Sequence, residues 1–327
     1  MGLLRPMLIG AESQAFDDPE YLYEIKFDGE RCLLRLDPAA GLTEPRNKRD
    51  VLLLPKFPEL AGLDQQVRGA CLLDGELIVA GEDGEPDFAE VQRRSLMSAP
   101  YKIQLAAKAR PASYVAYDIL ELSGEPVIAE PLWRRKELLA GVLIKETSSL
   151  ALSRWVQGRG TALFALAKER GLEGVVAKKR DSVYRPGTRT RDWVKIKNTI
   201  DDDFVVCGYI NKELGVISLV LGQYDGEDRL LYRGHVTTGV NSDAFSRVSR
   251  ARRRRTPPFD SPVPAGHGNE LAVWLCPSLV CSVKFMAYNA AGGLRQPALK
   301  GLREDKSPRE CRAPEPVNKG GDPYAAG

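Results

Sequence analysis

The sequence predicts an α+β fold in two parts, and three observations lead to this expectation. Residues 1–198 alternate strand-like runs with helical stretches, which is typical of mixed α+β structure. Residues 204–308 show short strands separated by turns, which favours a small all-β barrel. The polar, acidic segment 199–203 lies between the two patterns, and we expect it to be a hinge between two domains. An ordinary surface loop would have the same composition.

The expected strands of the first part are runs of β-branched and other apolar residues that alternate with polar ones. They comprise residues 20–36, 70–80, 113–122, 172–179 and 193–197. The segment 161–170 is expected to form an amphipathic helix, with Leu163, Phe164 and Ala167 facing inward. Gly171 is expected to end this helix.

The second part is expected to consist of strands alone. They comprise residues 204–209, 216–224, 230–240 and 271–285. The last residues, 309–327, are rich in Pro and Gly, and we expect them to form a flexible tail.

Composition excludes several classes of function. The net charge is only +3, so nucleic-acid binding has to be argued from where the charges lie. With two histidines, a histidine zinc site or a Ser-His-Asp triad is not expected. The six cysteines form no Cys-x-x-Cys pair, which favours reduced thiols in a cytoplasmic protein. No apolar run reaches the ~18 residues of a membrane span, so no membrane partner is expected.

The segment 23–31 carries the most informative motif, Lys26-x-Asp28-Gly29. On strand geometry Glu24, Lys26 and Asp28 share one face, while the apolar residues between them point into a core. This places a lysine amine among polar groups on a rigid support, which suits covalent catalysis by lysine. Alone the motif is a weak indication, because the same residues also occur in ordinary turns.

The motif resembles the signature of the covalent nucleotidyltransferases, which comprise DNA ligases, RNA ligases and mRNA capping enzymes. Further segments resemble other elements of this superfamily in the same order, namely 73–79, 114–120, 172–178, 184–189, 193–197 and 294–306. The resemblance extends from about residue 7 to about residue 308. It is strongest to ATP-dependent DNA ligases, both compact bacterial ligases and the ligase module of end-joining repair enzymes. It implies an antiparallel-sheet nucleotidyltransferase domain over 1–198 and an OB-fold over 204–308.

Three lysines are the candidates for phosphate chemistry. The resemblance makes Lys26 the nucleophile. Trp193, Lys195 and Lys197 share one face of the expected strand 193–197, so two ammonium groups can meet an α-phosphate where negative charge develops. The alternative is a solvated strand face.

The resemblance also implies a nucleotide and metal site. Glu173 is the candidate metal ligand, because Mg²⁺ prefers hard oxygen ligands, and Glu76 contacts the ribose and approaches the metal. Tyr117 stacks on adenine, with a buried core tyrosine as the alternative. Glu24 reads the adenine edge, and Arg31 contacts the ribose and later the DNA.

The resemblance also implies that Asp28 and several further basic residues bind DNA, the nucleotide or pyrophosphate. Arg46 resembles the arginine that meets the nick phosphate beside the nucleotide, with a turn arginine as the alternative, and Asp28 is assigned to the DNA side. Arg189 is assigned to the nucleotide. The resemblance implies that Arg303 and Lys306 bind the leaving pyrophosphate, so the first step is expected to need closure about the hinge.

The densest basic run is a candidate phosphate track, with a solvated loop as the alternative. It comprises Arg252, Arg253, Arg254 and Arg255, preceded by Arg250.

The implied function is ATP-dependent ligation of nicked duplex DNA through lysyl-AMP on Lys26. ATP and Mg²⁺ (or Mn²⁺) are the implied cofactors, and an end-binding repair protein such as Ku is a candidate partner of a monomeric enzyme. One alternative is an RNA ligase or an mRNA-capping-type nucleotidyltransferase. Another is a non-catalytic nick-binding module, which would require the loss of Lys26, Glu173 or Lys195, and all three are present.

Overall fold

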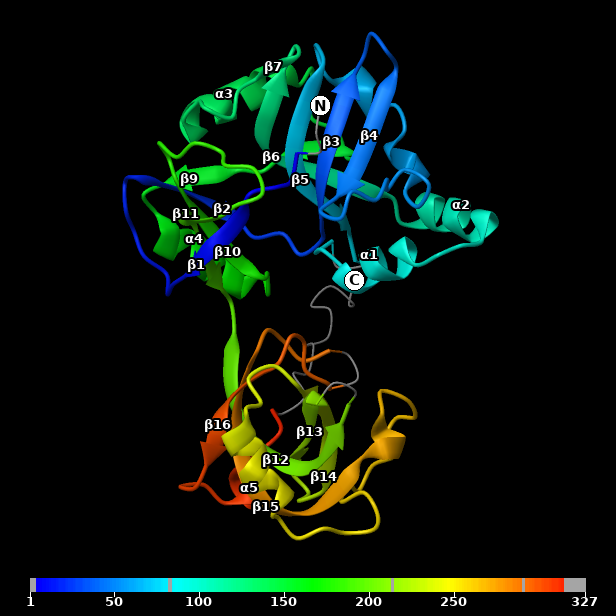
Figure 1. Ribbon diagram of the computed structural model, residues 1–327, viewed down its shortest axis with the longest axis vertical. Helices are drawn as coiled ribbons and strands as arrows, with labels where there is room; N and C mark the ends of the chain where they lie inside the picture. The colour runs from blue at the N-terminus through cyan, green and yellow to red at the C-terminus, as the bar shows by residue number, and fades with distance from the viewer. Residues whose placement is uncertain (1–3, 82–83, 213–214, 290–291, 315–327) are drawn as a thin grey trace, which may run out of the picture. The chain divides into compact units, whose positions relative to one another are not determined.

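The computed structural model describes residues 4–81, 84–212, 215–289 and 292–314, and the chain forms two compact units, residues 1–198 and 199–327 (Figure 1). Each unit has its own sheet structure and its own hydrophobic core. Within the described residues no helix is both long enough and apolar enough to cross a membrane.

The first sheet of unit 1 contains five strands in the order β1-β11-β10-β2-β9, antiparallel except for the β1–β11 pair. They are β1 (Leu8–Glu12), β2 (Tyr21–Ile25), β9 (Trp155–Gln157), β10 (Gly174–Lys179) and β11 (Arg189–Lys197). Helix α4 (Gly160–Glu169) packs on one face, where Leu163, Phe164 and Ala167 join apolar residues of β10 and β11. The expected helix and its inward face are confirmed, and Gly171 follows it with a φ of +67°.

The second sheet of unit 1 contains six strands, ordered β4-β3-β5-β6-β7 with β8 paired to β6. They are β3 (Glu30–Asp37), β4 (Leu42–Asn47), β5 (Cys71–Val79), β6 (Ala112–Leu122), β7 (Glu125–Pro126) and β8 (Leu150–Leu152). Alternate residues of β3, including Leu34 and Leu36, are buried in a core with β5 and β6, so Leu33 and Arg35 lie on the other face. The unit also contains α1 (Phe88–Ser95), α2 (Pro100–Ala109), α3 (Leu132–Val142) and the short 3-10 helices η1 (Pro58–Leu60) and η2 (Leu63–Gln66).

The expected single strand over 20–36 is wrong. The segment forms β2 in the first sheet and β3 in the second, and residues 26–29 connect the two sheets. The chain leaves strand conformation at residues 26–29, between its pairing in the two sheets. Lys26 therefore lies in a connection at the junction of the sheets, and the expected common strand face of Glu24, Lys26 and Asp28 does not form.

Unit 2 is built on a five-stranded antiparallel sheet in the order β14-β13-β12-β15-β16, and the domain is OB-fold-like. Its strands are β12 (Ile200–Asn211), β13 (Ile217–Tyr224), β14 (Leu230–Val236), β15 (Val273–Phe285) and β16 (Ala298–Arg303). Helix α5 (Ser242–Ser249) makes the unit β-rich rather than all-β. The Asn241 side chain caps this helix by accepting the Ala244 N–H, and Ala244 and Val248 are buried. Single-turn 3-10 helices η4 (Asn269–Leu271) and η5 (Pro308–Glu310) complete it.

The acidic segment 199–203 is not a loop, because β12 begins at Ile200. Asp201, Asp202 and Asp203 pair with residues 282–284 of β15. Their carboxylates are compensated; for example, Lys300 binds Asp201 at 2.7 Å and Gln223 donates to Asp202 at 2.9 Å. An acidic sequence can therefore form a strand here, because tertiary partners form ion pairs or hydrogen bonds with its carboxylates.

The expected flexible tail is wrong for its first residues. The Cys311 side chain is buried in a small core beside β12 and β13, and Tyr224 exchanges backbone hydrogen bonds with the segment, donating to the Cys311 carbonyl at 2.8 Å and accepting from the Ala313 N–H at 2.8 Å. The remainder of the expected tail, 315–327, lies outside the described residues.

Candidate active site

Lys26 is held where the two sheets of unit 1 meet. Its backbone N–H donates to the Gly174 carbonyl at 2.9 Å, which extends the β2–β10 pairing by one residue beyond β2. Its Nζ donates to Glu173 Oε2 at 2.6 Å. The Lys26 side chain is 21% exposed and that of Glu173 only 5%, so the amine stays accessible while the carboxylate is shielded. The structure thus joins the predicted nucleophile to the predicted metal ligand.

Two glycines allow this close approach. A Cβ at Gly29 would lie 2.2 Å from the Leu77 carbonyl oxygen, so a side chain there would push the connection away from β5. Gly174 has a φ of +139°, and a Cβ there would lie 2.1 Å from the Ile196 carbonyl oxygen. Glycine in the Lys-x-Asp-Gly motif is therefore needed to seat the lysine between the sheets.

A cavity of about 310 Å³ opens beside Lys26. This volume lies at the lower end of the range for small-molecule sites. Side chains from both sheets line it, with the first sheet contributing Glu24, Val176, Lys178, Arg189, Trp193 and Lys195, and the second contributing Arg31, Glu76 and Tyr117. Most of the predicted nucleotide-binding residues therefore converge on one cavity.

Two aromatic rings form one wall of the cavity. Tyr117 and Trp193 meet edge to face, with ring centroids 6.4 Å apart. The Arg31 guanidinium lies 5.3 Å from the Tyr117 centroid and is held by Asp74, with Nη2 and Oδ2 2.5 Å apart. Tyr117 is only partly buried, so it is not an enclosed core tyrosine, and its ring faces a cavity in which a base could stack.

A buried charge cluster surrounds Glu24, which lines the cavity. Its carboxylate pairs with Lys136 at 2.7 Å and Lys178 at 3.0 Å, and it accepts a hydrogen bond from Ser153 Oγ at 2.7 Å. Burial raises the pKa of Glu24, but the two lysine charges outweigh burial, so the net shift is downward. Glu24 is therefore a negatively charged hydrogen-bond acceptor in the lining of the cavity.

Lys178 is a lining residue that the sequence analysis missed. Its Nζ lies 4.3 Å from the Tyr117 centroid and 4.5 Å from the Trp193 centroid. Burial lowers the pKa of Lys178 to about 8, although the Glu24 charge opposes this. Alternation along the expected strand did not single it out, because it places Lys178 on the face opposite to the predicted site residue Glu173.

The lysines of β11 lie as the alternation predicts. Trp193 and Lys195 line the cavity, while Val194 and Ile196 are buried in the core under α4. Lys195 Nζ lies 3.2 Å from Glu12 Oε2. Burial and the neighbouring charge of Lys195 lower the pKa of Lys197, which does not itself line the cavity. Because Trp193 is 1% exposed, a wholly solvated face is excluded.

The two predicted metal ligands both lie beside Lys26. Burial raises the pKa of Glu76 to about 7, against the lowering effect of Arg31 and Lys26, and the Glu173 charge raises it further. In the described part of the chain no group of three or more His, Cys, Asp or Glu side chains could hold a metal ion. Two hard carboxylates beside Lys26 nevertheless fit Mg²⁺ or Mn²⁺, which commonly take one or two carboxylates together with substrate phosphates.

Two predicted residues of unit 1 lie away from the cavity lining. Arg46 lines a separate hollow, where its guanidinium pairs with Glu44 at 2.7 Å and Asp50 at 3.3 Å. The prediction that Arg46 contacts the nucleotide is therefore not supported by its position. Asp28 is partly buried in the connection after Lys26 and does not line the cavity. Arg189 does line it, and donates to the Ile9 carbonyl at 2.6 Å.

Arg303 and Lys306 converge within unit 2. Both bind Asp203 Oδ2, Arg303 through Nη1 at 2.7 Å and Lys306 through Nζ at 2.8 Å. Arg303 also pairs with Asp305. The two cations are therefore positioned together by one buried carboxylate, which the sequence analysis had placed in the hinge.

The arginine run forms an arm along β15 rather than a free loop. The Arg254 N–H donates to the Trp274 carbonyl at 3.0 Å, and the Arg252 carbonyl accepts from Cys276 at 2.8 Å. Arg252–Arg255 are all exposed, and none of their guanidinium groups has an acidic partner within the described residues. Four uncompensated cations on a fixed backbone are suited to contact phosphates.

A lysine at the junction of two sheets, beside a cavity lined by carboxylates, lysines and an aromatic pair, defines the class of covalent nucleotidyltransferases. Residues 7–197 match the family described as ATP dependent DNA ligase domain, and residues 212–306 match the ATP dependent DNA ligase C terminal region. The chain therefore belongs to the ATP-dependent DNA ligase family.

Curated relatives and a solved structure agree with this assignment. DNA ligase C1 of Mycolicibacterium smegmatis (strain ATCC 700084 / mc(2)155) is 30% identical over 325 residues, covering 94% of this chain and 92% of that protein. The multifunctional non-homologous end joining DNA repair protein LigD of Mycobacterium tuberculosis (strain ATCC 25618 / H37Rv) is 30% identical over 299 residues. That alignment covers 89% of this chain but only 37% of LigD. A structure titled mycobacterial DNA ligase D complexed with ATP and MES is 28% identical with a TM-score of 0.53, covering 94% of this chain and 97% of that one.

Proposed function

We propose that this protein seals nicks in duplex DNA, using ATP, through a lysyl-AMP intermediate on Lys26. The observation that carries the proposal is the Lys26–Glu173 pair, 2.6 Å apart, at the mouth of a cavity with an aromatic wall and an acidic end. An accessible amine beside a shielded carboxylate and further lysines is suited to attack on a nucleotide phosphate.

The proposed reaction has three displacements at phosphorus. Lys26 Nζ forms a bond to the α-phosphorus of ATP as the bond to pyrophosphate breaks and the amine loses a proton. An oxygen of the 5′-phosphate at the nick then displaces the lysine from the adenylate. Finally the 3′-hydroxyl attacks the 5′-phosphorus, and AMP leaves. Positioning and charge neutralisation carry most of such catalysis.

The cavity residues have proposed roles in these steps. Tyr117 stacks on adenine, and Arg31 and Glu76 contact the ribose. Lys195 and Lys197 neutralise charge at the α-phosphate, and Arg189 contributes from the cavity rim. Glu173 with Glu76 would hold Mg²⁺ or Mn²⁺, which supplies further charge neutralisation when bound. Arg303 and Lys306 are proposed to bind the leaving pyrophosphate, exchanging Asp203 for phosphate oxygens.

The charge of Glu24 favours adenine over guanine. A carboxylate accepts a hydrogen bond from the exocyclic amino group of adenine, whereas the carbonyl oxygen at the same position of guanine would repel it. This argues for ATP rather than GTP and so against the mRNA-capping alternative. The nicked duplex and an end-joining role with a partner such as Ku are proposals supported by relatives named for non-homologous end joining.

Labelling with radioactive ATP tests the proposal. The parent protein should acquire AMP on Lys26, and Lys26→Ala should acquire none, because the nucleophile is lost. Lys26→Ala should still join a nick whose 5′ end is already adenylated, at reduced rate, which shows that the variant is folded. Persistent labelling of Lys26→Ala would refute the central assignment.

A further inference from the structure

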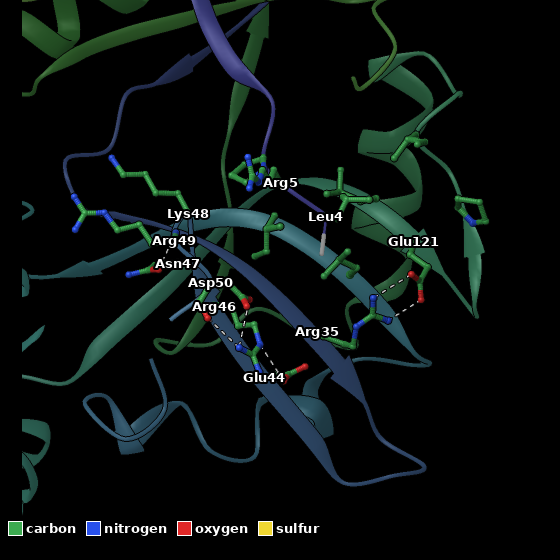
Figure 2. A pocket seen from close by; sticks show the side chains of 16 residues that line it. Leu4, Arg5, Arg35, Glu44, Arg46, Asn47, Lys48, Arg49, Asp50 and Glu121 are labelled. Atoms are coloured by element: carbon green, nitrogen blue, oxygen red, sulfur yellow. Dashed lines mark hydrogen bonds and ion pairs between the residues drawn. The ribbon is translucent and has the colours of Figure 1, made fainter. Parts of the chain in front are cut away.

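A second and larger hollow lies on unit 1, outside the nucleotide cavity. Its volume is about 880 Å³ (Figure 2). Its floor includes Leu33, Leu72 and Leu120, which belong to the same small core as Trp193 of the nucleotide cavity. Its charged lining consists of the basic residues Arg5, Arg35, Arg46, Lys48 and Arg49 and the acidic residues Glu44, Asp50 and Glu121. The hollow therefore combines an apolar floor with a charged rim.

The acidic residues of the hollow are fully engaged by two of its arginines. Arg35 forms a bidentate pair with Glu121, at 2.8 and 3.2 Å, and Arg46 binds both Glu44 and Asp50 (Figure 2). The two arginines therefore bring no uncompensated positive charge to a ligand. Arg46, which stands at the position where the family meets the nick phosphate, is balanced by two carboxylates.

The side chains of Arg5, Lys48 and Arg49 make up the uncompensated charge. All three are exposed, and none has an acidic partner among the described residues. Figure 2 shows Lys48 and Arg49 at one end of the hollow, with Arg35 and Glu121 at the other. The end near Lys48 and Arg49 is therefore the end that attracts an anion.

Lys48 joins the hollow to the nucleotide cavity. Together with Pro6 it lines both, whereas Lys26 and Glu76 line only the nucleotide cavity. An anionic group bound by Lys48 would therefore lie beside both the hollow and the cavity that contains Lys26. This position suits the terminal phosphate of a DNA strand whose other nucleotides occupy the hollow.

We propose that the hollow binds the DNA strand that carries the 5′-phosphate, and that Lys48 rather than Arg46 binds that terminal phosphate. The inference rests on the proposed ligase function. Arg5 and Arg49 contact internal phosphates of the strand. Charge decides the occupant, because five basic side chains line the hollow against three acidic ones, and each acidic side chain already pairs with an arginine.

Binding of the full-length protein to two nicked duplexes tests the proposal. The duplexes are identical except for a 5′-phosphate or a 5′-hydroxyl at the nick. The parent should bind the 5′-phosphate duplex more tightly. Lys48→Ala should lose that preference by about tenfold, the loss expected for one charge-assisted contact. Lys48→Arg should restore most of it. Arg46→Ala combined with Glu44→Gln and Asp50→Asn, which leaves no unpaired carboxylate, should change it by less than Lys48→Ala.

Salt dependence tests the remainder of the hollow. Arg5→Ser and Arg49→Ser should weaken binding of both duplexes and lower the slope of log affinity against log salt by roughly 0.9 each. Lys168→Ser is the matched control, because Lys168 is an exposed cation on α4 that lines neither cavity.

Two kinds of result would overturn the inference. One is a full 5′-phosphate preference in Lys48→Ala, or its complete loss in the variant that combines Arg46→Ala with Glu44→Gln and Asp50→Asn. The other is a salt slope for Arg5→Ser and Arg49→Ser equal to that of Lys168→Ser. Labelling of the parent with AMP, run alongside, tests the proposed function separately, so failure of the strand site is distinguishable from failure of the ligase assignment.

Discussion

Lys178 shows how a single buried charge shapes the cavity beside Lys26, which is proposed to bind the nucleotide. It is 3% exposed, and it lies between the carboxylate of Glu24 and the rings of Tyr117 and Trp193. Burial disfavours its charged form, while Glu24 and the aromatic faces favour it. With Lys136 it keeps Glu24 ionised, so the acceptor proposed to read adenine depends on two lysines outside the recognised motifs.

The pKa of Lys178 predicts a pH-dependent stability. Its folded-state pKa is about 8, below the ordinary 10.5, so the unfolded chain binds more protons between these values. The free energy of unfolding contributed by this group therefore rises with pH from about 8 to about 10.5 and is constant below 8. Between pH 7.5 and 9.5 the parent should gain on the order of 1 to 2 kcal/mol relative to Lys178→Met.

Denaturant unfolding of both proteins at the two pH values measures this difference. Lys168→Met is the control, because an exposed lysine should leave the curves of parent and variant parallel. If Lys178→Met also ran parallel to the parent, the side chain would not titrate in this window.

At the scale of elements, two segments determine where the side chains proposed to bind ligands are placed. The segment 26–29 crosses from one sheet to the other, which seats Lys26 at their junction instead of on a strand face. The arm of Arg252–Arg255 is pinned to β15 by backbone hydrogen bonds, so its side chains are presented from a fixed support. In both cases the backbone pairing, more than the local sequence, sets the direction of the side chains.

Replacement of Arg252, Arg253, Arg254 and Arg255 by serine should weaken nick binding. If each guanidinium meets one phosphate, the slope of log affinity against log salt should fall by roughly 0.9 for each lost contact. Affinity measured at several salt concentrations gives the slope, and lysyl-AMP formation, which does not involve DNA, reports whether the variant is folded.

Arg229→Ser is the matched control for the arm. Arg229 is an exposed arginine of unit 2 that already pairs with Asp225 at 2.8 Å, so its loss should affect the slope less than loss of one arm arginine. If the variant with all four arginines replaced kept both the salt slope and the affinity of the parent, the arm would be a solvated segment that does not contact DNA.

At the scale of the whole molecule, the two units have separate cores and carry different proposed functions. Unit 1 holds the cavity and Lys26, and unit 2 holds Arg303 and Lys306. Asn198 belongs structurally to unit 1, because its N–H donates to the Glu173 carbonyl at 2.9 Å and its side chain donates to Leu172 at 3.1 Å. A cut after Asn198 therefore preserves the contacts around Glu173.

A fragment of residues 1–198 should fold but react poorly with ATP. Its cores are internal, so the circular dichroism of a folded domain should remain, while the proposed pyrophosphate contacts are lost. The rate of lysyl-AMP formation should fall by at least tenfold, as expected when charge-assisted contacts to a leaving group are removed. Full-length Arg303→Ala/Lys306→Ala should show the same defect, and a fragment that labels at the full-length rate would refute the role of unit 2.

The sequence by itself determined the family, the strands and helix that alternate clearly, and about half of the residues that line the cavity. The alternation in 193–197 correctly placed Trp193 and Lys195 against the cavity, because side-chain direction along a strand is a local property. Only the tertiary structure decided which charges are free. Arg46 is neutralised by Glu44 and Asp50 while Lys48 is not, Asp203 gathers Arg303 and Lys306, and Lys178 is buried beneath two rings. These outcomes depend on partners distant in sequence or on local folds of the backbone, and no periodicity in the chain encodes such pairings.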